Sequence, residues 1–342
     1  MTDADVVIDL EPEPLLAGDG PLLRIANLEV SFPTEEGVVQ AVRGVDLEVY
    51  ANETLGVVGE SGSGKSVTML AVMGLLPKTA RISGSATYRG EELLGKRGLI
   101  RRYRGGKIAM IFQDPLTALN PVHRVGAQIA EAVLAHHPSL GRRGADDKAI
   151  DLLDLVGIPQ PKTRARQYPH EFSGGMRQRA MIAMAIANDP DVLIADEPTT
   201  ALDVTVQAQI LEVIQRVQEA VGAAVVFITH DLGVIARLAT RVQVMYAGRV
   251  AEVGAVDDIY FRPAHPYTRG LLDSLPRLDV HGERLNPIPG APPSMVSPPP
   301  ACAFHPRCPM AQPVCSEETP ALRFIEGSRR GACHFAEDVS PS

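Results

Sequence analysis

The stretch Gly59-Glu60-Ser61-Gly62-Ser63-Gly64-Lys65-Ser66 decides the fold of this chain. It follows the apolar run Thr54-Leu55-Gly56-Val57-Val58, and a helix is expected to begin at Lys65 or Ser66. A strand, a glycine-rich loop and a helix in this order form a phosphate-binding loop, or P-loop. The glycines let backbone N–H groups turn towards phosphate oxygens, and the helix N-terminus adds a partial positive charge.

The residue types within this loop predict separate roles. Lys65 is expected to reach the β- and γ-phosphates of a nucleotide, and the Ser66 hydroxyl is placed to bind Mg²⁺. The predicted nucleotide-binding residues are Gly59, Glu60, Ser61, Gly62, Ser63, Gly64, Lys65, Ser66 and Val67.

A second apolar run ends in two acidic residues. Val192-Leu193-Ile194-Ala195 has the length of a buried strand, and Asp196 and Glu197 follow it directly. Beside a P-loop, Asp196 is expected to hold Mg²⁺, and Glu197 to orient and deprotonate an attacking water. On its own, such an acidic pair is equally typical of a solvated turn.

Two more polar side chains end apolar runs. Gln113 follows Met110-Ile111-Phe112, and His230 follows Val226-Phe227-Ile228-Thr229. Ligands of α/β proteins bind at the carboxyl ends of the strands. We therefore expect Gln113 to reach Mg²⁺ or the water, and His230 to contact the γ-phosphate.

Composition excludes several classes of protein. The 342 residues carry a net charge of −8 and no long basic stripe, which argues against a nucleic-acid partner. The basic segment 96–107 is interpreted as a solvated loop. No run approaches the roughly 20 apolar residues of a membrane span. The acidic start lacks the basic and apolar regions of a secretory signal, so a cytosolic protein is expected.

A further stretch, Phe172-Ser173-Gly174-Gly175-Met176, precedes a predicted helix over 176–187. This stretch resembles the signature of ATP-binding-cassette (ABC) ATPases. The full set of motifs matches that family in order: the P-loop, Gln113, the signature, the acidic pair, Thr200-Ala201-Leu202-Asp203 and His230. The resemblance covers about residues 22–255. It implies an α/β P-loop NTPase (RecA-like) core with an antiparallel β subdomain and an α-helical signature subdomain.

The resemblance also implies where ATP binds. In this family two cassettes pair head to tail, and each ATP lies between the P-loop of one and the signature of the other. Ser173, Gly174, Gly175 and Asp203 are therefore expected to serve a partner's nucleotide, and Phe32 to stack on adenine, although a core Phe is nearly as plausible. Asp203 is also a candidate N-cap. Phe172 and Met176 replace the commoner Leu and Gln.

The flanks of the signature narrow the resemblance. Tyr168 to Arg179, His265-Pro266-Tyr267-Thr268, Ile288 to Pro293 and Cys302 to Cys308 are similar to oligopeptide/dipeptide importer ATPases. This implies a paralogous second ATPase, two transmembrane permease subunits and an extracytoplasmic substrate-binding protein, with the chain at the cytoplasmic face of the membrane. Import of nickel, haem or sugars by the same ATPase type is an alternative, and so is a non-transport ABC ATPase.

The cysteines are confined to the end of the chain, at Cys302, Cys308, Cys315 and Cys333. Their spacing lacks the tight pair that is usual in zinc sites. It suits an iron–sulfur cluster better, and the subfamily resemblance points to [4Fe–4S]. Zinc, free thiols and disulfides remain alternatives.

These patterns predict an acidic disordered tail over 1–21, a nucleotide-binding domain over 22–255 and a Cys-rich extension over 256–342. The helical subdomain is expected at about 116–178. The Pro-rich span 287–300 should be extended.

Overall fold

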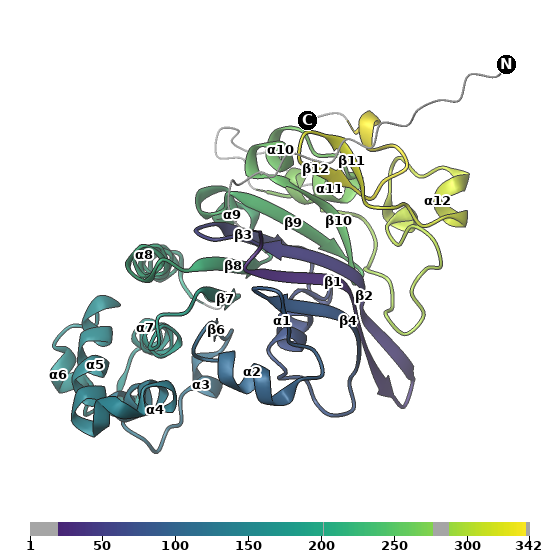
Figure 1. The fold of residues 1–342 in the computed structure, drawn as a ribbon. Helices are drawn as coiled ribbons and strands as arrows, with labels where there is room; N and C mark the ends of the chain where they lie inside the picture. The colour runs from purple at the N-terminus through teal and green to yellow at the C-terminus, as the bar shows by residue number, and fades with distance from the viewer. Residues whose placement is uncertain (1–19, 201, 276–286, 340–342) are drawn as a thin grey trace.

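The structure is a computed structural model that describes residues 20–200, 202–275 and 287–339 (Figure 1). The tail expected over 1–21 therefore lies almost wholly outside the described residues. The strands are β1 Leu23–Thr34, β2 Gly37–Val49, β3 Thr54–Val58, β4 Arg81–Tyr88, β5 Glu91–Glu92, β6 Ile108–Ile111, β7 Val192–Asp196, β8 Ala224–Thr229, β9 Arg241–Tyr246, β10 Arg249–Ala255, β11 Arg323–Glu326 and β12 Arg329–Gly331.

The helices are α1 Lys65–Val72, α2 Arg97–Tyr103, α3 Pro115–Ala118, α4 Val125–His136, α5 Gly141–Leu155, α6 Pro161–Arg164, α7 Gly174–Ala185, α8 Val204–Val221, α9 Leu232–Leu238, α10 Val256–Phe261, α11 Pro266–Asp273 and α12 Pro313–Glu317. Short 3₁₀ turns span Pro138–Leu140, Pro169–Glu171, His305–Arg307 and Ala336–Asp338. The described part of the Pro-rich span has neither helix nor strand.

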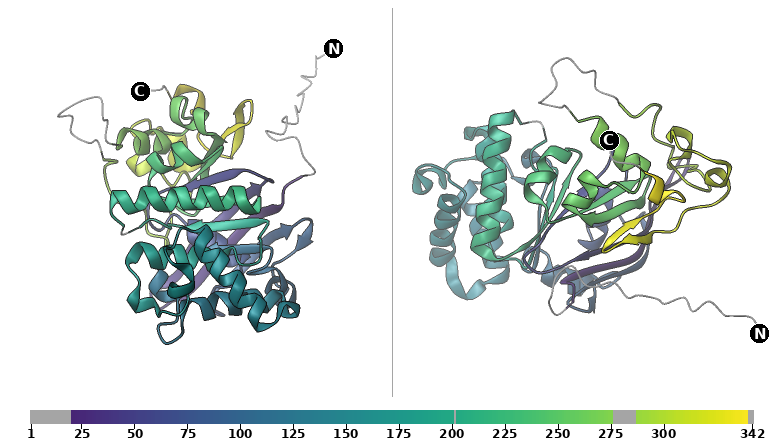
Figure 2. Two further views of the ribbon diagram at one scale, coloured as in Figure 1. Left: turned by 90° about the vertical axis from the view of Figure 1, so that its left-hand side faces the viewer. Right: turned by 90° about the horizontal axis from the view of Figure 1, so that it is seen from above.

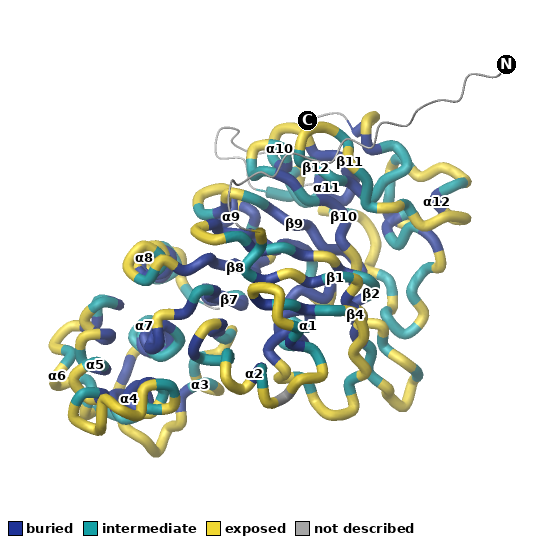
Figure 3. The backbone as a smooth tube through the Cα atoms, in the orientation of Figure 1, coloured by how far each residue is buried: buried dark blue, intermediate teal, exposed yellow. Residues whose placement is uncertain are grey.

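The larger sheet has the order β11-β12-β10-β9-β3-β8-β7-β6. The pairs β9–β3, β3–β8, β8–β7 and β7–β6 are parallel, whereas β9–β10, β10–β12 and β12–β11 are antiparallel. Every residue of β3, β7 and β8 is buried, as Figure 3 shows in dark blue. Parallel strands covered on both faces require such continuous apolar runs.

The two faces of this sheet bury different partners. Along β7, Leu193 and Ala195 belong to a hydrophobic cluster shared with α4, α5, α7 and α8. Val192 and Ile194 point to the opposite face, into a cluster with α1 and the strands β1 and β2. Because strand side chains alternate, one run of apolar residues supplies both cores.

A second, antiparallel sheet of order β2-β1-β4-β5 packs over α1 (Figure 1). The helices α4 to α7 form a separate group at the other side of the larger sheet, as the right view of Figure 2 shows. This arrangement confirms the predicted fold class of a P-loop core with β and α subdomains.

The expectation for segment 96–107 was wrong. Residues Arg97–Tyr103 form α2, and Ile100 is buried. Leu99 and Tyr103 lie one turn apart and pack on the same hydrophobic cluster. The apolar residues of this segment give it a buried side, whereas Lys96, Arg101, Arg102 and Lys107 are exposed.

The C-terminal extension is continuous with the core sheet. Strand β12 pairs with β10 at Glu252–Gly331 and Val253–Arg330, and β11 continues the ladder. In Figure 1 the extension lies at the top, remote from α4 to α6. The sequence predicted an appended segment but not these strands.

Candidate functional site

The P-loop has the backbone that the glycines allow. Gly59, Gly62 and Gly64 have φ values of +151°, +79° and +99°. A Cβ on Gly59 would lie 2.2 Å from the carbonyl oxygen of Met245, and one on Gly64 would lie 2.6 Å from that of Ala41. Glycine is therefore required at Gly59 and Gly64 by close packing as well as by φ.

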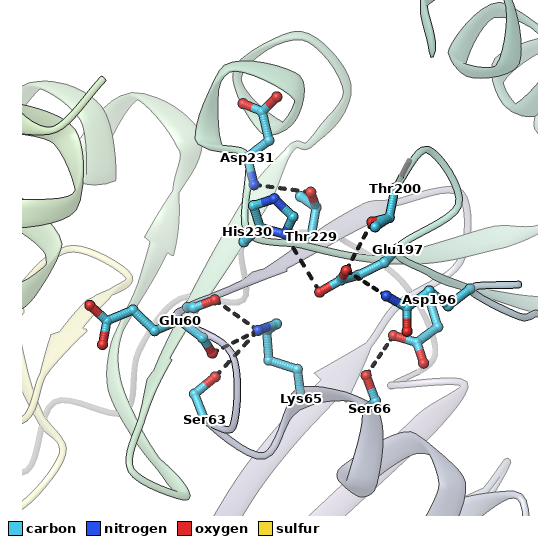
Figure 4. A network of polar contacts seen from close by, with 12 residues as sticks. Glu60, Ser63, Lys65, Ser66, Asp196, Glu197, Thr200, Thr229, His230 and Asp231 are labelled. Carbon is cyan, nitrogen blue, oxygen red and sulfur yellow. Dashed lines mark hydrogen bonds and ion pairs between the residues drawn. The ribbon is translucent and has the colours of Figure 1, made fainter. Parts of the chain in front are cut away.

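The Lys65 side chain forms hydrogen bonds within the P-loop itself. Its Nζ donates to the carbonyl oxygens of Gly59 at 2.7 Å and Glu60 at 3.0 Å, and lies 3.4 Å from Ser63 Oγ (Figure 4). The side chain is buried, and this burial lowers the pKa of its ammonium group. Negative phosphates next to Lys65 would favour the charged form again.

Ser66 and Asp196 meet across the P-loop and the end of β7. Ser66 Oγ donates to Asp196 Oδ1 at 2.7 Å, and Figure 4 shows the two side chains pointing towards each other. Burial raises the pKa of Asp196, and the nearby Glu197 adds to the rise. A hydroxyl beside a buried carboxylate suits Mg²⁺, whose charge would keep Asp196 ionised.

Glu197 is surrounded by three polar side chains. Gln113 Nε2 donates to Oε2 at 3.1 Å, Thr200 Oγ1 donates to the same oxygen at 2.9 Å, and His230 Nδ1 lies 3.6 Å from Oε1. Gln113 thus contacts the predicted base rather than Ser66 or Asp196. The three partners fix the carboxylate at the carboxyl edge of the sheet, where an attacking water could be aligned.

The backbone at Glu197 is strained. Its φ is +45°, a left-handed conformation that costs a non-glycine residue about 1–3 kcal/mol. The conformation is held by the Glu197 N–H donating to Ile228 O at 2.9 Å and by the Thr200 N–H donating to Glu197 O at 3.1 Å. The turn therefore aims the carboxylate before any ligand binds.

Comparison with known proteins shows to which family the chain belongs. Residues 42–200 match the family described as "ABC transporter", and residues 251–315 match "Oligopeptide/dipeptide transporter, C-terminal region". The "Dipeptide transport ATP-binding protein DppD" of Bacillus subtilis is 53% identical over 91% of this chain and 94% of its own length. The chain belongs to the ABC transporter family.

Two other matches define the extent of this similarity. The "Oligopeptide transport ATP-binding protein OppD" of Mycobacterium bovis is also 53% identical over 94% of this chain, but the chain spans about half, 53%, of that relative's length. The solved structure titled "Dimeric Structure of MJ0796, a Bacterial ABC Transporter Cassette" aligns with a TM-score of 0.61 and 25% identity. That alignment covers 68% of this chain and 98% of the other.

The signature of this ABC cassette lies apart from its P-loop. Ser173 is the N-cap of α7 and accepts the Met176 N–H at 3.3 Å. Within the described residues, no hydrogen bond joins 173–175 to the P-loop or the acidic pair. The signature instead lines a cavity of about 360 Å³ together with Asp203.

Asp203 caps α8 and Phe32 lies on β1, and the contacts of both residues with a nucleotide stay predictions. Asp203 is the N-cap of α8, where its Oδ1 accepts the Val206 N–H at 2.9 Å, so the capping prediction is confirmed. Phe32 is half-buried on β1 and packs at the edge of the core of the β subdomain. Val67 likewise packs in that cluster from α1.

The four cysteines line one small cavity, here called the thiol cavity. It has a volume of about 10 Å³ and also contacts His305 and His334. Burial raises the pKa of the thiols of Cys302, Cys308 and Cys333, that of Cys333 to about 11. Across the described residues, no three His, Cys, Asp or Glu side chains are arranged so that they could hold a metal ion. Metal clusters are bound by thiolates, so the raised pKa values of Cys302, Cys308 and Cys333 oppose binding until these thiols ionise.

Sequence reasoning missed two kinds of contact. Thr200 was part of a quoted stretch, but nothing in its spacing indicated a bond to Glu197. Glu60 was expected at the nucleotide, yet its carboxylate pairs with Arg307 of the C-terminal extension. The Glu60–Arg307 pair joins residues 247 positions apart, so no local pattern indicates it.

Proposed function

We propose that this chain is the ATP-binding and ATP-hydrolysing subunit of an importer of dipeptides or oligopeptides. The observation that carries the proposal is the joining of Lys65, the Ser66–Asp196 pair and the Glu197 group at one sheet edge. Transport relatives covered almost to full length, and the match at 251–315, support the peptide cargo.

The chemistry follows from the positions of these side chains. Backbone N–H groups and Lys65 neutralise the phosphates of ATP, and Ser66 and Asp196 would hold Mg²⁺. Mg²⁺ supplies charge neutralisation of the β- and γ-phosphates when bound. Glu197 takes the proton of the attacking water, while Gln113 and Thr200 keep its carboxylate in place. His230 lies 3.6 Å from Glu197 and its side chain is 62% exposed, so it would reach the γ-phosphate from its place beside the base.

We further propose that a second cassette completes each ATP site. In the described part of the chain no hydrogen bond joins residues 173–175 to the P-loop, which supports this arrangement, because a helix N-terminus favours an anion that a partner's ATP would supply. A paralogue is the expected partner, giving a heterodimer. The head-to-tail pair would close on ATP and open after hydrolysis, a two-state change set by the γ-phosphate.

Two permease subunits and an extracytoplasmic binding protein complete the proposed importer, with the chain at the cytoplasmic face of the membrane. A groove of about 450 Å³ supports a docking site beside Gln113 and α4. It is lined mainly by apolar side chains, among them Met73, Phe112, Met181 and Met184. Within the described residues no helix is long and apolar enough to cross a bilayer.

Reconstitution tests this function. Proteoliposomes that contain the permeases, the partner cassette and this chain should hydrolyse Mg–ATP faster when the binding protein carries a dipeptide or oligopeptide. If nickel, haem or a sugar stimulates hydrolysis instead, the peptide cargo proposed here is wrong. The absence of hydrolysis by the assembled complex would overturn the ATPase proposal itself.

The thiol cavity is proposed to hold a [4Fe–4S] cluster, with Zn²⁺ as the alternative. The convergence of four cysteines on one cavity supports it. Protein purified without oxygen should absorb broadly near 400 nm and contain about four irons per chain. Cys315→Ser should lose that iron, whereas Ser316→Ala at an exposed neighbouring position should retain it. Stoichiometric zinc without iron would contradict the cluster.

A further inference from the structure

Arg307 of the C-terminal extension is bound to the P-loop by two parallel hydrogen bonds. Its Nη1 lies 2.8 Å from Glu60 Oε2, and its Nη2 lies 2.9 Å from Glu60 Oε1. The Arg307 side chain is 5% exposed and that of Glu60 is 26% exposed. A buried two-point pair of this kind holds orientation as well as charge, unlike a solvated surface pair.

All donors of the guanidinium have acceptors. Besides Glu60, Nη1 donates to Tyr246 Oη at 3.2 Å, Nε to Pro289 O at 2.9 Å and Nη2 to Ile288 O at 3.3 Å. The rings of Tyr246 and Phe304 flank the same group. Arg307 is therefore fixed before it meets the loop, so little side-chain entropy is lost in holding Glu60.

Glu60 is held through its backbone as well. Its N–H donates to Tyr267 Oη at 2.8 Å, and its carbonyl accepts from Lys65. Tyr267 is fully buried and, like Arg307, belongs to the C-terminal extension. Two side chains from the extension thus fix the start of the loop that carries Lys65, the residue proposed to bind phosphate.

We infer that Arg307 is a positioning residue for the P-loop, through which the C-terminal extension sets the affinity of the cassette for nucleotide. The inference rests on the proposed ATP site. An ordered loop binds phosphate without a further loss of conformational entropy, whereas a released loop must be ordered on binding. The C-terminal extension thus contributes to nucleotide binding by keeping the P-loop ordered.

The test is a double-mutant cycle on nucleotide binding in the full chain. Arg307→Met and Glu60→Gln should each raise the Kd for Mg–ATP about tenfold, within the usual range of coupling between sites. The double variant should bind no more weakly than the worse single variant, because both remove one contact. Arg307→Lys, which cannot form the two-point pair, should fall between wild type and Arg307→Met.

A matched control exists in the same extension. Arg323 and Glu337 form an exposed ion pair with no contact to the P-loop. Arg323→Met and Glu337→Gln repeat the chemical changes, and their Kd should stay within about twofold of wild type. If Arg307→Met does not fold, Glu60→Gln and Tyr267→Phe carry the test.

Steady-state kinetics of the assembled complex separate positioning from a loss of folded protein. In Arg307→Met the KM for ATP should rise about tenfold with kcat nearly unchanged, because the residues around Glu197 are not touched. A lower kcat at constant KM would mean only fewer folded molecules. Wild type that fails to bind Mg–ATP would defeat the proposed function. Wild type that binds, with a folded Arg307→Met that binds equally well, would overturn this inference alone.

Discussion

The nucleotide site and the thiol cavity differ in how their side chains are brought together. The nucleotide site collects polar residues at the carboxyl ends of β3, β6, β7 and β8, and hydrogen bonds join Ser66 to Asp196 and Gln113 to Glu197. The thiol cavity collects four cysteines within one stretch, 302–333, where Cys315 lies in the short helix α12 and the other three lie in irregular segments. A regular sheet edge places distant residues by rule, whereas irregular turns require a tertiary structure of their own.

The comparison shows which site is arranged in advance. Glu197 is already aimed by a strained turn and three polar neighbours. Around the thiol cavity of about 10 Å³, burial instead raises the pKa values of the Cys302, Cys308 and Cys333 thiols, which favours their protonated form. The nucleotide site is therefore preorganised for its ligand, whereas the thiol cavity must rearrange to bind a metal.

The largest effect should come from the preorganised carboxylate. In Glu197→Gln, loss of the base should lower kcat by at least about 100-fold, with ATP still bound. Phosphate release and nucleotide retention measure the two effects. Glu212→Gln, on the exposed face of α8, should behave as wild type. Hydrolysis at the wild-type rate would remove Glu197 from the role of base.

Loop packing should give the next largest effect. In Gly59→Ala the new Cβ would collide with Met245 O at 2.2 Å, at a φ that disfavours alanine. The variant should lose on the order of 2–4 kcal/mol of stability, together with nucleotide binding. Gly98→Ala, in α2 with no heavy atom near its Cβ, should change stability by less than about 1 kcal/mol. Denaturant titration of both variants measures the difference, and equal changes would show that loop packing is not the cause.

The contact between strand β10 and the C-terminal extension should make the stability of the folded chain depend on pH. Glu252 on β10 accepts the N–H groups of Ala264 at 2.6 Å and His265 at 3.0 Å, and burial raises its pKa from 4.5 to about 7. The folded chain therefore keeps a proton that the unfolded chain releases. The resulting stability is complete below pH 4.5 and is lost as pH rises through 7.

Glu252→Gln should remove this loss, which is on the order of 3 kcal/mol at most. The difference between the wild-type and variant unfolding free energies, measured from pH 4 to 8, isolates Glu252 from the buried His265, whose pKa is lowered to about 4. Glu326→Gln, in the exposed strand β11, should leave the profile unchanged. Parallel wild-type and Glu252→Gln curves would contradict the assignment.

The smallest effect should come from one of the three neighbours of Glu197. In Thr200→Val the hydroxyl that donates to Glu197 is lost while Gln113 and His230 remain. A hydrogen bond to a charged carboxylate contributes about 1.5–3 kcal/mol. Because Gln113 still bonds the same oxygen, we expect the lower end of this range, so kcat should fall roughly tenfold at unchanged KM. Thr117→Val, which removes an exposed hydroxyl that bonds Asp114 O, is the matched control. A full loss of activity would mean that Thr200 does more than orient the base.

Much of the nucleotide site was predictable because its residues follow local rules. The strand–loop–helix order around Lys65, the acidic pair after β7 and the N-cap Asp203 each depend on neighbours in sequence. Their convergence then follows from parallel strands, whose carboxyl ends share one edge. The sequence therefore predicted both the residues and the side of the sheet.

The remaining features depend on contacts between distant segments. Pairing of β12 with β10 and the Arg307–Glu60 pair join residues far apart in the chain, and neither partner carries a spacing that indicates the other. The error at α2 has a different origin. The charges of 96–107 were given more weight than the spacing of Leu99, Ile100 and Tyr103, which form the buried side of that helix.

The Arg307–Glu60 pair also bears on how the cassette is made. Glu60 precedes Arg307 by 247 residues. At about 5–20 residues per second, roughly 12–50 seconds of synthesis separate them. Late in that interval, once residue 255 has been made, the chain contains the whole P-loop and strands β1 to β10 but still lacks the side chain that fixes the loop. On this view a nascent cassette gains its full hold on ATP only after Arg307 has been synthesised, well after the P-loop itself.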